Sequence, residues 1–166
     1  MPISGTFASA NTVKQDGPVS LSAHIPKGLI PRAKYPSMIR EGIIGKGSMK
    51  VTDKDTAMSL GSGTLPVLAT PAMILLIERA VSECLVPFLK EGESTVGTSL
   101  DIRHSAPSVV GSEVFCSAEI IETNGPKIVF EIRVWDSAGE VGSGRHERFL
   151  VDDIRFMSRA ASRTKG

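Results

Sequence analysis

The stretch that decides the fold is TPAMILLIERAVSECLVPFL, which runs from Thr70 to Leu89. Thr70 followed by Pro71 predicts a helix start, with a hydroxyl as the N-cap and proline at the first helical position. The first two turns are apolar almost all round, which is typical of a helix buried on most sides. Pro87 is expected to mark the last turn. Other elements of the chain must therefore cover one long helix.

Four segments after this helix alternate between apolar and polar residues, as half-buried strands do. They cover residues 95–105, 113–123, 127–136 and 140–151. In the first segment one parity is apolar and ends in a histidine: Val96, Leu100, Ile102 and His104. The turn sequences Asn124-Gly125-Pro126 and Ser137-Ala138-Gly139 join the later segments. Tight connections between successive strands predict an antiparallel meander.

Shorter elements flank the helix and the strands. Residues 46–52 read as a strand, and Thr52-Asp53 can cap a helical turn that Gly61-Ser62-Gly63 ends. Asp152 or Asp153 can cap a final helix. Because the long helix is buried on most sides, we expect the sheet to curl round it, which gives an α+β domain. One such sheet leaves its edges uncovered, so a homodimer is expected, with a dimer of dimers left open.

Length and composition describe one globular domain. The chain has 166 residues, of which 41% are hydrophobic and 22% charged. Residues 1–37 are rich in Gly, Pro, Ser and basic residues, and we interpret them as a mobile leader or extension before a domain at 38–166. Cys84 and Cys116 belong to no CxxC motif, which favours buried thiols in a reducing compartment. The cytoplasm is therefore expected, or an organelle matrix if the leader is a transit peptide.

Charge and motif content argue against several kinds of partner. Lys and Arg number 19 against 18 Asp and Glu, so the formal net charge of +1 favours neither nucleic acid nor a membrane surface. The longest aliphatic run, Ala72 to Ile77, is far shorter than the roughly 20 residues of a membrane span. No His/Cys/Asp/Glu cluster has the spacing of metal ligands, so neither a metal nor another cofactor is expected.

Three polar side chains are candidates for chemistry. Glu78 lies two turns into the buried helix, where desolvation would favour a general base, although a solvated stripe shared with Arg79 is an equal alternative. His104 continues an apolar strand face, where a structural histidine is the alternative. Thr70 is explained by capping, yet a helix start also offers free N–H groups to an oxyanion. Spacing alone leaves open whether the three converge.

Glycines and an arginine on the strands complete the candidates. Gly97, Gly142 and Gly144 lie inside strands, where glycine often marks a bulge or a close approach of backbone or ligand. Arg148 follows His146-Glu147, and its parity leaves open whether it points inward or forms a surface ion pair.

Three blocks of this sequence resemble the fluoroacetyl-CoA thioesterase-like family of hot-dog proteins. The blocks are LGSGTLPVLATPAMILLIE, EGESTVGTSLDIRHSAPSVVGSEV and GEVGSGRHERFLVD. Their order and spacing match over roughly residues 45–161. The resemblance implies a hot-dog fold in which a long central helix is wrapped by a curved antiparallel sheet. It also implies a dimer with composite active sites and a pantetheine tunnel at the interface.

The resemblance assigns roles to five residues by their motif positions. Thr70, Glu78 and His104 match the catalytic threonine, glutamate and histidine of the family. Gly97 in the TVGT block matches a glycine whose N–H helps to hold the thioester carbonyl, and Arg148 in the HERF block matches an arginine at the edge of the active site. The segment before Thr70 contains no aromatic residue, so fluoroacetate resistance is not predicted.

These observations predict a thioesterase that hydrolyses short or medium acyl-CoA thioesters. Glu78 would activate water or attack the carbonyl itself, and the two routes stay open. A non-catalytic acyl-CoA-binding dimer is the first alternative. An enoyl-CoA hydratase is the second, and it is less favoured because no aspartate lies between Thr70 and Asp101.

Overall fold

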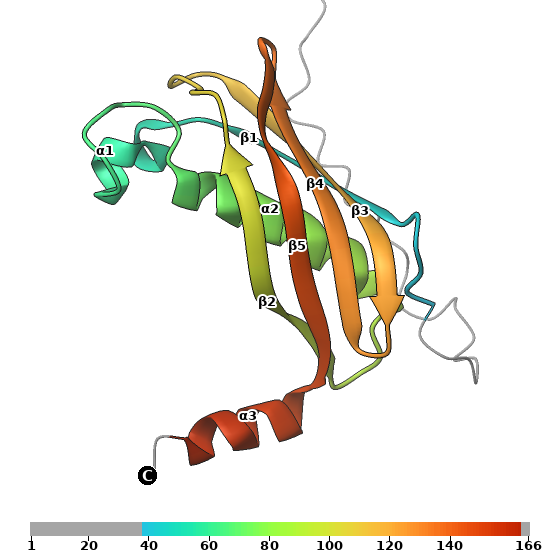
Figure 1. The fold of residues 1–166 in the computed structure, drawn as a ribbon. Helices are drawn as coiled ribbons and strands as arrows, with labels where there is room; N and C mark the ends of the chain where they lie inside the picture. The colour runs from blue at the N-terminus through green and yellow to red at the C-terminus, as the bar shows by residue number, and fades with distance from the viewer. Residues whose placement is uncertain (1–37, 164–166) are drawn as a thin grey trace, which may run out of the picture. The chain divides into compact units, whose positions relative to one another are not determined.

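The computed structural model describes residues 38–163, so the predicted leader at 1–37 lies outside the described residues. Figure 1 shows α2 against the concave side of one curved antiparallel sheet, which confirms the predicted architecture. The elements follow in this order: β1 Ile44–Lys50, η1 Asp53–Asp55, α1 Ala57–Leu60, α2 Thr70–Leu85, η2 Val86–Phe88, β2 Glu93–His104, β3 Glu113–Asn124, β4 Lys127–Asp136, β5 Gly139–Asp152 and α3 Asp153–Ser162.

The start of α2 differs from the prediction in one residue. Ala69 is the N-cap and makes no side-chain cap, while Thr70 is the first helical residue and Pro71 lies in the first turn. The predicted N-cap role of Thr70 is therefore wrong. The Thr70 hydroxyl is engaged by His104 instead, which removes it from capping. The helix ends at Leu85, four residues before the predicted Leu89, and Pro87 lies in the 3₁₀ turn that follows it.

One face of α2 packs on the sheet to form the core of the domain. Seven residues of the helix are buried: Ala72, Met73, Leu76, Ile77, Ala80, Val81 and Leu85. They meet the inward side chains of β3 and β4, including Val114, Ile120, Phe130, Ile132 and Val134. Leu75 is the apolar exception on the helix, at 50% exposed. The helix is thus buried on more than one side but keeps one accessible stripe.

The order of strands in the sheet is β1-β3-β4-β5-β2. The meander of β3, β4 and β5 is confirmed, but β2 pairs with β5 and does not continue the meander to β3. The connection at 105–112 is too long for a tight hairpin and includes Pro107, so it carries the chain across to the other edge of the sheet. The 12-residue strand β2 is consequently an edge strand.

A bulge in β2 changes which side chains face the helix. The register with β5 shifts between Gly97 and Ser99, so one residue is inserted and the alternation reverses. Before the bulge, Thr95 and Gly97 face the interior, and after it His104 does. The prediction that Val96 shares the face of His104 is therefore wrong, because a strict period of two does not survive an inserted residue.

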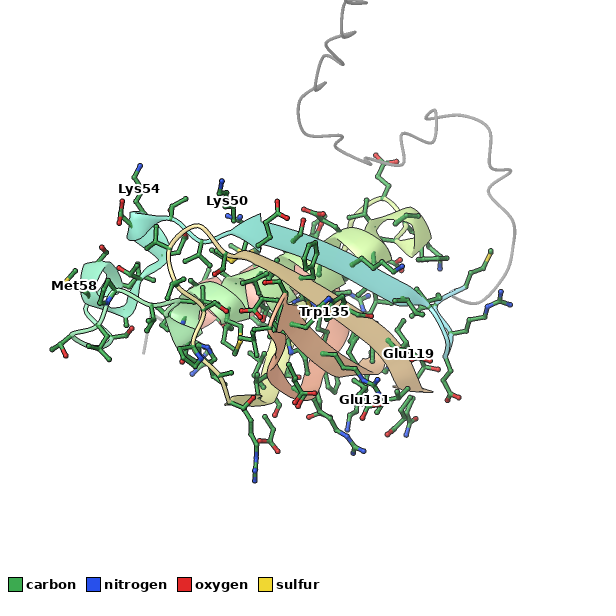
Figure 2. The ribbon with its side chains drawn as sticks, turned by 90° about the horizontal axis from the view of Figure 1, so that it is seen from above. Lys50, Lys54, Met58, Glu119, Glu131 and Trp135 are labelled. Carbon is green, nitrogen blue, oxygen red and sulfur yellow. The ribbon has the colours of Figure 1, made fainter. Side chains whose placement is uncertain are left out.

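The convex face of the sheet carries aromatic and charged side chains. Phe115 and Trp135 stack there with ring centroids 6.0 Å apart, and Glu119 lies opposite Glu131 in the β3–β4 ladder. Figure 2 labels Glu119, Glu131 and Trp135 on these two strands. The residues that alternate with these on β3 and β4 face the other way and are buried against α2. The functional candidates lie on this same concave side of the sheet.

Two of the singled-out glycines serve close packing of backbone. A Cβ at Gly144, whose φ is +153°, would lie 2.0 Å from the Asp101 carbonyl oxygen. A Cβ at Gly142 would lie 2.6 Å from the Arg103 carbonyl oxygen. The lack of a side chain at both positions therefore lets the backbones of β2 and β5 approach closely, which is one of the reasons expected for a glycine inside a strand.

Candidate active site

Glu78 lies in the third turn of α2 and is held by two side chains from β5. The guanidinium Nη1 of Arg148 donates to Glu78 Oε2, and Nε2 of His146 lies 3.3 Å from Glu78 Oε1. The Glu78 side chain is nevertheless 30% exposed. The carboxylate thus has a buried cation behind it and an accessible side in front, which suits a group that must meet a substrate.

Arg148 is turned inward and serves as the anchor of this cluster. Its Nε donates to Thr95 Oγ1 at 3.0 Å, and its Nη2 donates to the Thr95 carbonyl oxygen at 2.7 Å. The residue is only 5% exposed, so its side chain points inward and does not form the surface ion pair that was the alternative. The guanidinium therefore fixes the carboxylate of α2 to the edge strand β2 through three hydrogen bonds.

His146 is a member of the cluster that the sequence analysis did not single out. It is completely buried, and its Nδ1 donates to the Ser99 carbonyl oxygen at 2.9 Å. Because a carbonyl oxygen only accepts, this bond assigns the proton to Nδ1 and directs Nε2 at Glu78. His146 shares the parity of Arg148 on β5, so an inward Arg148 would have implied an inward His146.

Gly97 makes room for the carboxylate. A Cβ at this position would lie 2.6 Å from Glu78 Oε1 and 3.1 Å from Cε1 of His146. Gly97 therefore lies beside Glu78, as its motif position implied. Its predicted use as an oxyanion donor remains a prediction.

Thr70 and His104 form a second, separate pair at the start of α2. The Thr70 hydroxyl and Nδ1 of His104 are 2.9 Å apart. Burial lowers the pKa of His104 from its usual 6.5, and the backbone of Ala106 opposes this shift more weakly. Within residues 38–163, no group meets the buried Nε2 of His104 with hydrogen-bond geometry. This nitrogen thus lacks the partner that a buried polar atom normally has.

One chain does not bring the three predicted catalytic residues together. Thr70 and Glu78 are eight residues apart on α2, which corresponds to about 12 Å along the helix axis. His104, the last residue of β2, contacts Thr70 at the start of α2, whereas Glu78 contacts Arg148 and lies beside Gly97, seven residues earlier on β2. The chain therefore holds a histidine–hydroxyl pair and a carboxylate cluster as two separate groups.

The cysteines are inert in this arrangement. Burial raises the pKa of the Cys84 thiol to about 11, with the Arg148 charge opposing the shift, and burial raises that of Cys116 to about 12. Both are free thiols, as predicted. In the described part of the chain, no group of three or more His, Cys, Asp or Glu side chains could hold a metal ion. Nor is any helix among residues 38–163 long and apolar enough to cross a membrane.

Solved structures of thioesterases resemble this fold over most of the domain. A structure of the fluoroacetyl-CoA thioesterase matches with a TM-score of 0.70 and 27% identity, over 75% of this chain and 96% of that one. A Thermus thermophilus protein described as a thioesterase superfamily member matches at 0.71 and 26%, over 76% and 94%. A hot-dog-like protein from Thermanaerovibrio acidaminovorans matches at 0.71 and 25%, over 76% and 93%. The predicted hot-dog fold is confirmed.

Sequence comparison also identifies a fluoroacetyl-CoA thioesterase as a relative. The fluoroacetyl-CoA thioesterase of Streptantibioticus cattleyicolor is 31% identical over 98 residues, which are 59% of this chain and 70% of that enzyme. Residues 51–153 match the model of a family described as fluoroacetyl-CoA-specific thioesterase. The matched region contains α2, strands β2 to β5 and all five motif residues, and the chain belongs to the fluoroacetyl-CoA-specific thioesterase family.

Proposed function

We propose that this protein hydrolyses short or medium acyl-CoA thioesters to the free acid and coenzyme A, in active sites shared between two copies of the chain. The observation that carries the proposal is Glu78, a partly exposed carboxylate held from behind by the buried Arg148. Family membership supports thioester hydrolysis as the reaction. A relative was solved with fluoroacetate and CoA, which supports a CoA thioester as the substrate.

A dimer can unite the two groups that one chain keeps apart. Thr70 and Glu78 lie four residues to either side of Ile74 on α2. A two-fold axis that crosses the helix near Ile74 would bring Thr70 and His104 of one copy to Glu78 of the other, and would do so twice. Three features support this arrangement: the unpaired edge of β2, the exposed Leu75 and the unpartnered Nε2 of His104.

The residues then have distinct roles. Glu78 acts as the base on water, or as the nucleophile, and Arg148 keeps it ionised before the reaction. His104 moves a proton at Nε2 while Thr70 holds its Nδ1. The N–H of Gly97 stabilises the oxyanion. The water and anhydride routes are separated by single turnover in labelled water, because only an anhydride transfers label into the Glu78 carboxylate.

The non-catalytic alternative depends on the same carboxylate. An acyl-CoA-binding dimer would be supported by a Glu78 that is paired and inaccessible, with no cavity beside His104. Glu78 is paired with Arg148, yet its side chain is 30% exposed, and this exposure favours catalysis. A hydratase lacks support, since no aspartate lies between Thr70 and Asp101 on α2 or the first half of β2.

The finer properties of the protein belong to the same proposal. We expect it to work as a cytoplasmic homodimer without a metal or another cofactor. The acyl preference is expected to lie outside fluoroacetyl-CoA, because the segment before Thr70 contains no aromatic residue. Neither nucleic acid nor a membrane is expected as a partner.

The deciding experiment measures release of free thiol from a panel of acyl-CoAs from acetyl to decanoyl, with fluoroacetyl-CoA included. We expect turnover of one acyl class and a loss of about 10²–10⁴-fold in the Glu78→Gln variant. Glu83→Gln is the matched control, because Glu83 is an exposed carboxylate on the same helix. Absence of turnover on the whole panel, from folded protein that still binds acyl-CoA, would contradict the enzymatic proposal and favour the binding dimer.

A further inference from the structure

His146 is the buried group that the proposed reaction leaves unused. It is completely buried, and each ring nitrogen has a defined neighbour. Nδ1 donates to the Ser99 carbonyl oxygen at 2.9 Å, so Nε2 is the ring nitrogen left with a lone pair in the neutral imidazole. Nε2 lies 3.3 Å from Glu78 Oε1. A neutral imidazole in this tautomer presents an accepting lone pair at Nε2, to which Nη1 of Arg148 donates at 3.5 Å and beside which Glu78 Oε1 lies.

Groups from α2, β2, β4 and β5 lie against this imidazole. Glu78 approaches from α2 and the Ser99 carbonyl from β2. Phe130 of β4 lies with its ring centroid 6.5 Å away. On β5 itself, Nη1 of Arg148 donates to Nε2 at 3.5 Å, a weak hydrogen bond that competes with its bond to Glu78 Oε2. The protonated thiol of Cys84 on α2 is the other titratable group near Arg148.

The two neighbours of Glu78 favour opposite states of the carboxylate. Arg148 donates to Oε2 and so favours the ionised carboxylate of the resting enzyme. An Nε2 lone pair beside Oε1 repels that ionised form, but accepts a hydrogen bond once Oε1 carries a proton. The contact therefore becomes favourable at the moment when Glu78 accepts a proton from water, and an interaction that strengthens along the reaction accelerates it.

We propose that His146 is a positioning residue of the reaction. Glu78 takes a proton from the attacking water on Oε1, and Nε2 of His146 accepts a hydrogen bond from this protonated oxygen. This inference rests on the proposed thioester hydrolysis. The water oxygen bonds to the carbonyl carbon, one water proton moves to Glu78 Oε1 and is held between Oε1 and Nε2, and the C–S bond breaks. The proton then leaves on the thiolate sulfur of coenzyme A, so the enzyme returns to its starting state.

Two conservative variants separate this role from a structural one. In His146→Asn the side-chain amide can keep the bond to the Ser99 carbonyl, but nothing accepts at the position of Nε2. In His146→Gln the longer amide reaches toward Glu78 and can present an accepting oxygen there. We expect kcat to fall about 10²-fold in His146→Asn and about tenfold in His146→Gln, with KM within about twofold of wild type.

If His146 only holds β5 to β2 through the Ser99 carbonyl oxygen, His146→Gln should lose more activity than His146→Asn, because only the asparagine keeps that hydrogen bond. Wild-type kcat in His146→Asn, or a larger loss in His146→Gln than in His146→Asn, would overturn the proposal. Circular dichroism and unfolding curves of both variants identify losses that come from misfolding.

An NMR measurement on the unaltered chain keeps the test independent of folding of the variants and of turnover. Long-range ¹H–¹⁵N spectra of the imidazole are expected to show a proton on Nδ1 and none on Nε2 at neutral pH. The ¹⁵N chemical shift of Nε2 is expected to change in Glu78→Gln, because the side chain beside it changes. A bare Nδ1, or an Nε2 chemical shift that is the same in Glu78→Gln, would overturn the inference even in an active enzyme. Inactivity on every acyl-CoA with the expected spectra would instead sink the proposed function alone.

Discussion

The two groups of the candidate site differ in how completely one chain satisfies them. Around Glu78, the guanidinium of Arg148 uses all of its nitrogens on named acceptors, and His146 has a neighbour at each ring nitrogen. At the start of α2, His104 bonds Thr70 on one side, and among residues 38–163 its buried Nε2 has no hydrogen-bond partner. The described residues of one chain thus satisfy the first group, whereas in the second they leave a nitrogen that the proposed dimer would have to satisfy.

Mixing two inactive variants is the strongest test of this difference. His104→Ala and Glu78→Gln are each expected to be nearly inactive. If the site is shared, a heterodimer carries one site with both residues intact, so a statistical mixture regains about a quarter of wild-type activity. Thiol release is measured after the two chains are refolded together. Each variant refolded alone is the control, and no recovery despite heterodimers seen by native mass spectrometry would assign both groups to one chain.

Removing the anchor of the complete group is expected to damage both stability and activity. Arg148→Met leaves Glu78 beside His146 without its cation. We expect a loss of about 2 kcal/mol in the free energy of unfolding, less than the ~3–5 kcal/mol of a fully buried pair because Glu78 is 30% exposed. We also expect kcat to fall about 10²-fold. Arg145→Met, an exposed position on the same strand, is the control, and equal effects in denaturation curves would refute the anchoring role.

Filling the space beside the carboxylate should have a moderate effect. In Gly97→Ala the new Cβ would lie 2.6 Å from Glu78 Oε1, so the carboxylate must move. We expect kcat to fall about tenfold and the free energy of unfolding by about 1 kcal/mol. Thr98→Ala, at the exposed bulge, is the control. A Gly97→Ala enzyme with wild-type kcat would show that the position of Glu78 is not critical to this extent.

Protonation of His104, in the pair with Thr70, is expected to have the smallest effect, a change in stability with pH. Because burial lowers the pKa of His104 below 6.5, the unfolded chain binds the proton first as the pH falls. Stability due to this residue is therefore present above about pH 6.5 and is lost as the pH falls toward the lower pKa of the folded state. Melting temperatures of wild type and His104→Asn between pH 8 and 5 should differ in this sense. Parallel curves would contradict the shift.

Much of the fold could be predicted because its signals are local. The apolar run of α2 and the alternation of β3, β4 and β5 indicate elements whose bounds differ from the prediction by a few residues at most. The pairing of β2 with β5 could not be predicted, since it depends on which sheet edge remains free after the meander forms. The bulge near Thr98 is likewise a product of pairing, and it reversed the predicted facing of Val96.

The sequence named candidate residues for the site but not their arrangement. Thr70, Glu78 and His104 stood out by their positions on the helix and strand and by their match to the family motif, and spacing along the helix carried no information on a second chain. His146 was not predicted because the alternation of apolar and polar residues is broken around Gly144. The inward orientation of Arg148 became clear only from its hydrogen bonds to Thr95.

The place of β2 at the sheet edge also bears on how the protein reaches its native state. The meander joins neighbours in sequence, whereas Arg148 bonds Thr95 across 53 residues and Glu78 across 70. Closing a longer loop costs more chain entropy, and long-range pairing slows folding. We therefore expect β2 to dock after the meander has formed on α2. The contacts that position Glu78 would then be the last to assemble, and a nascent chain would acquire its chemistry only when its folding is complete.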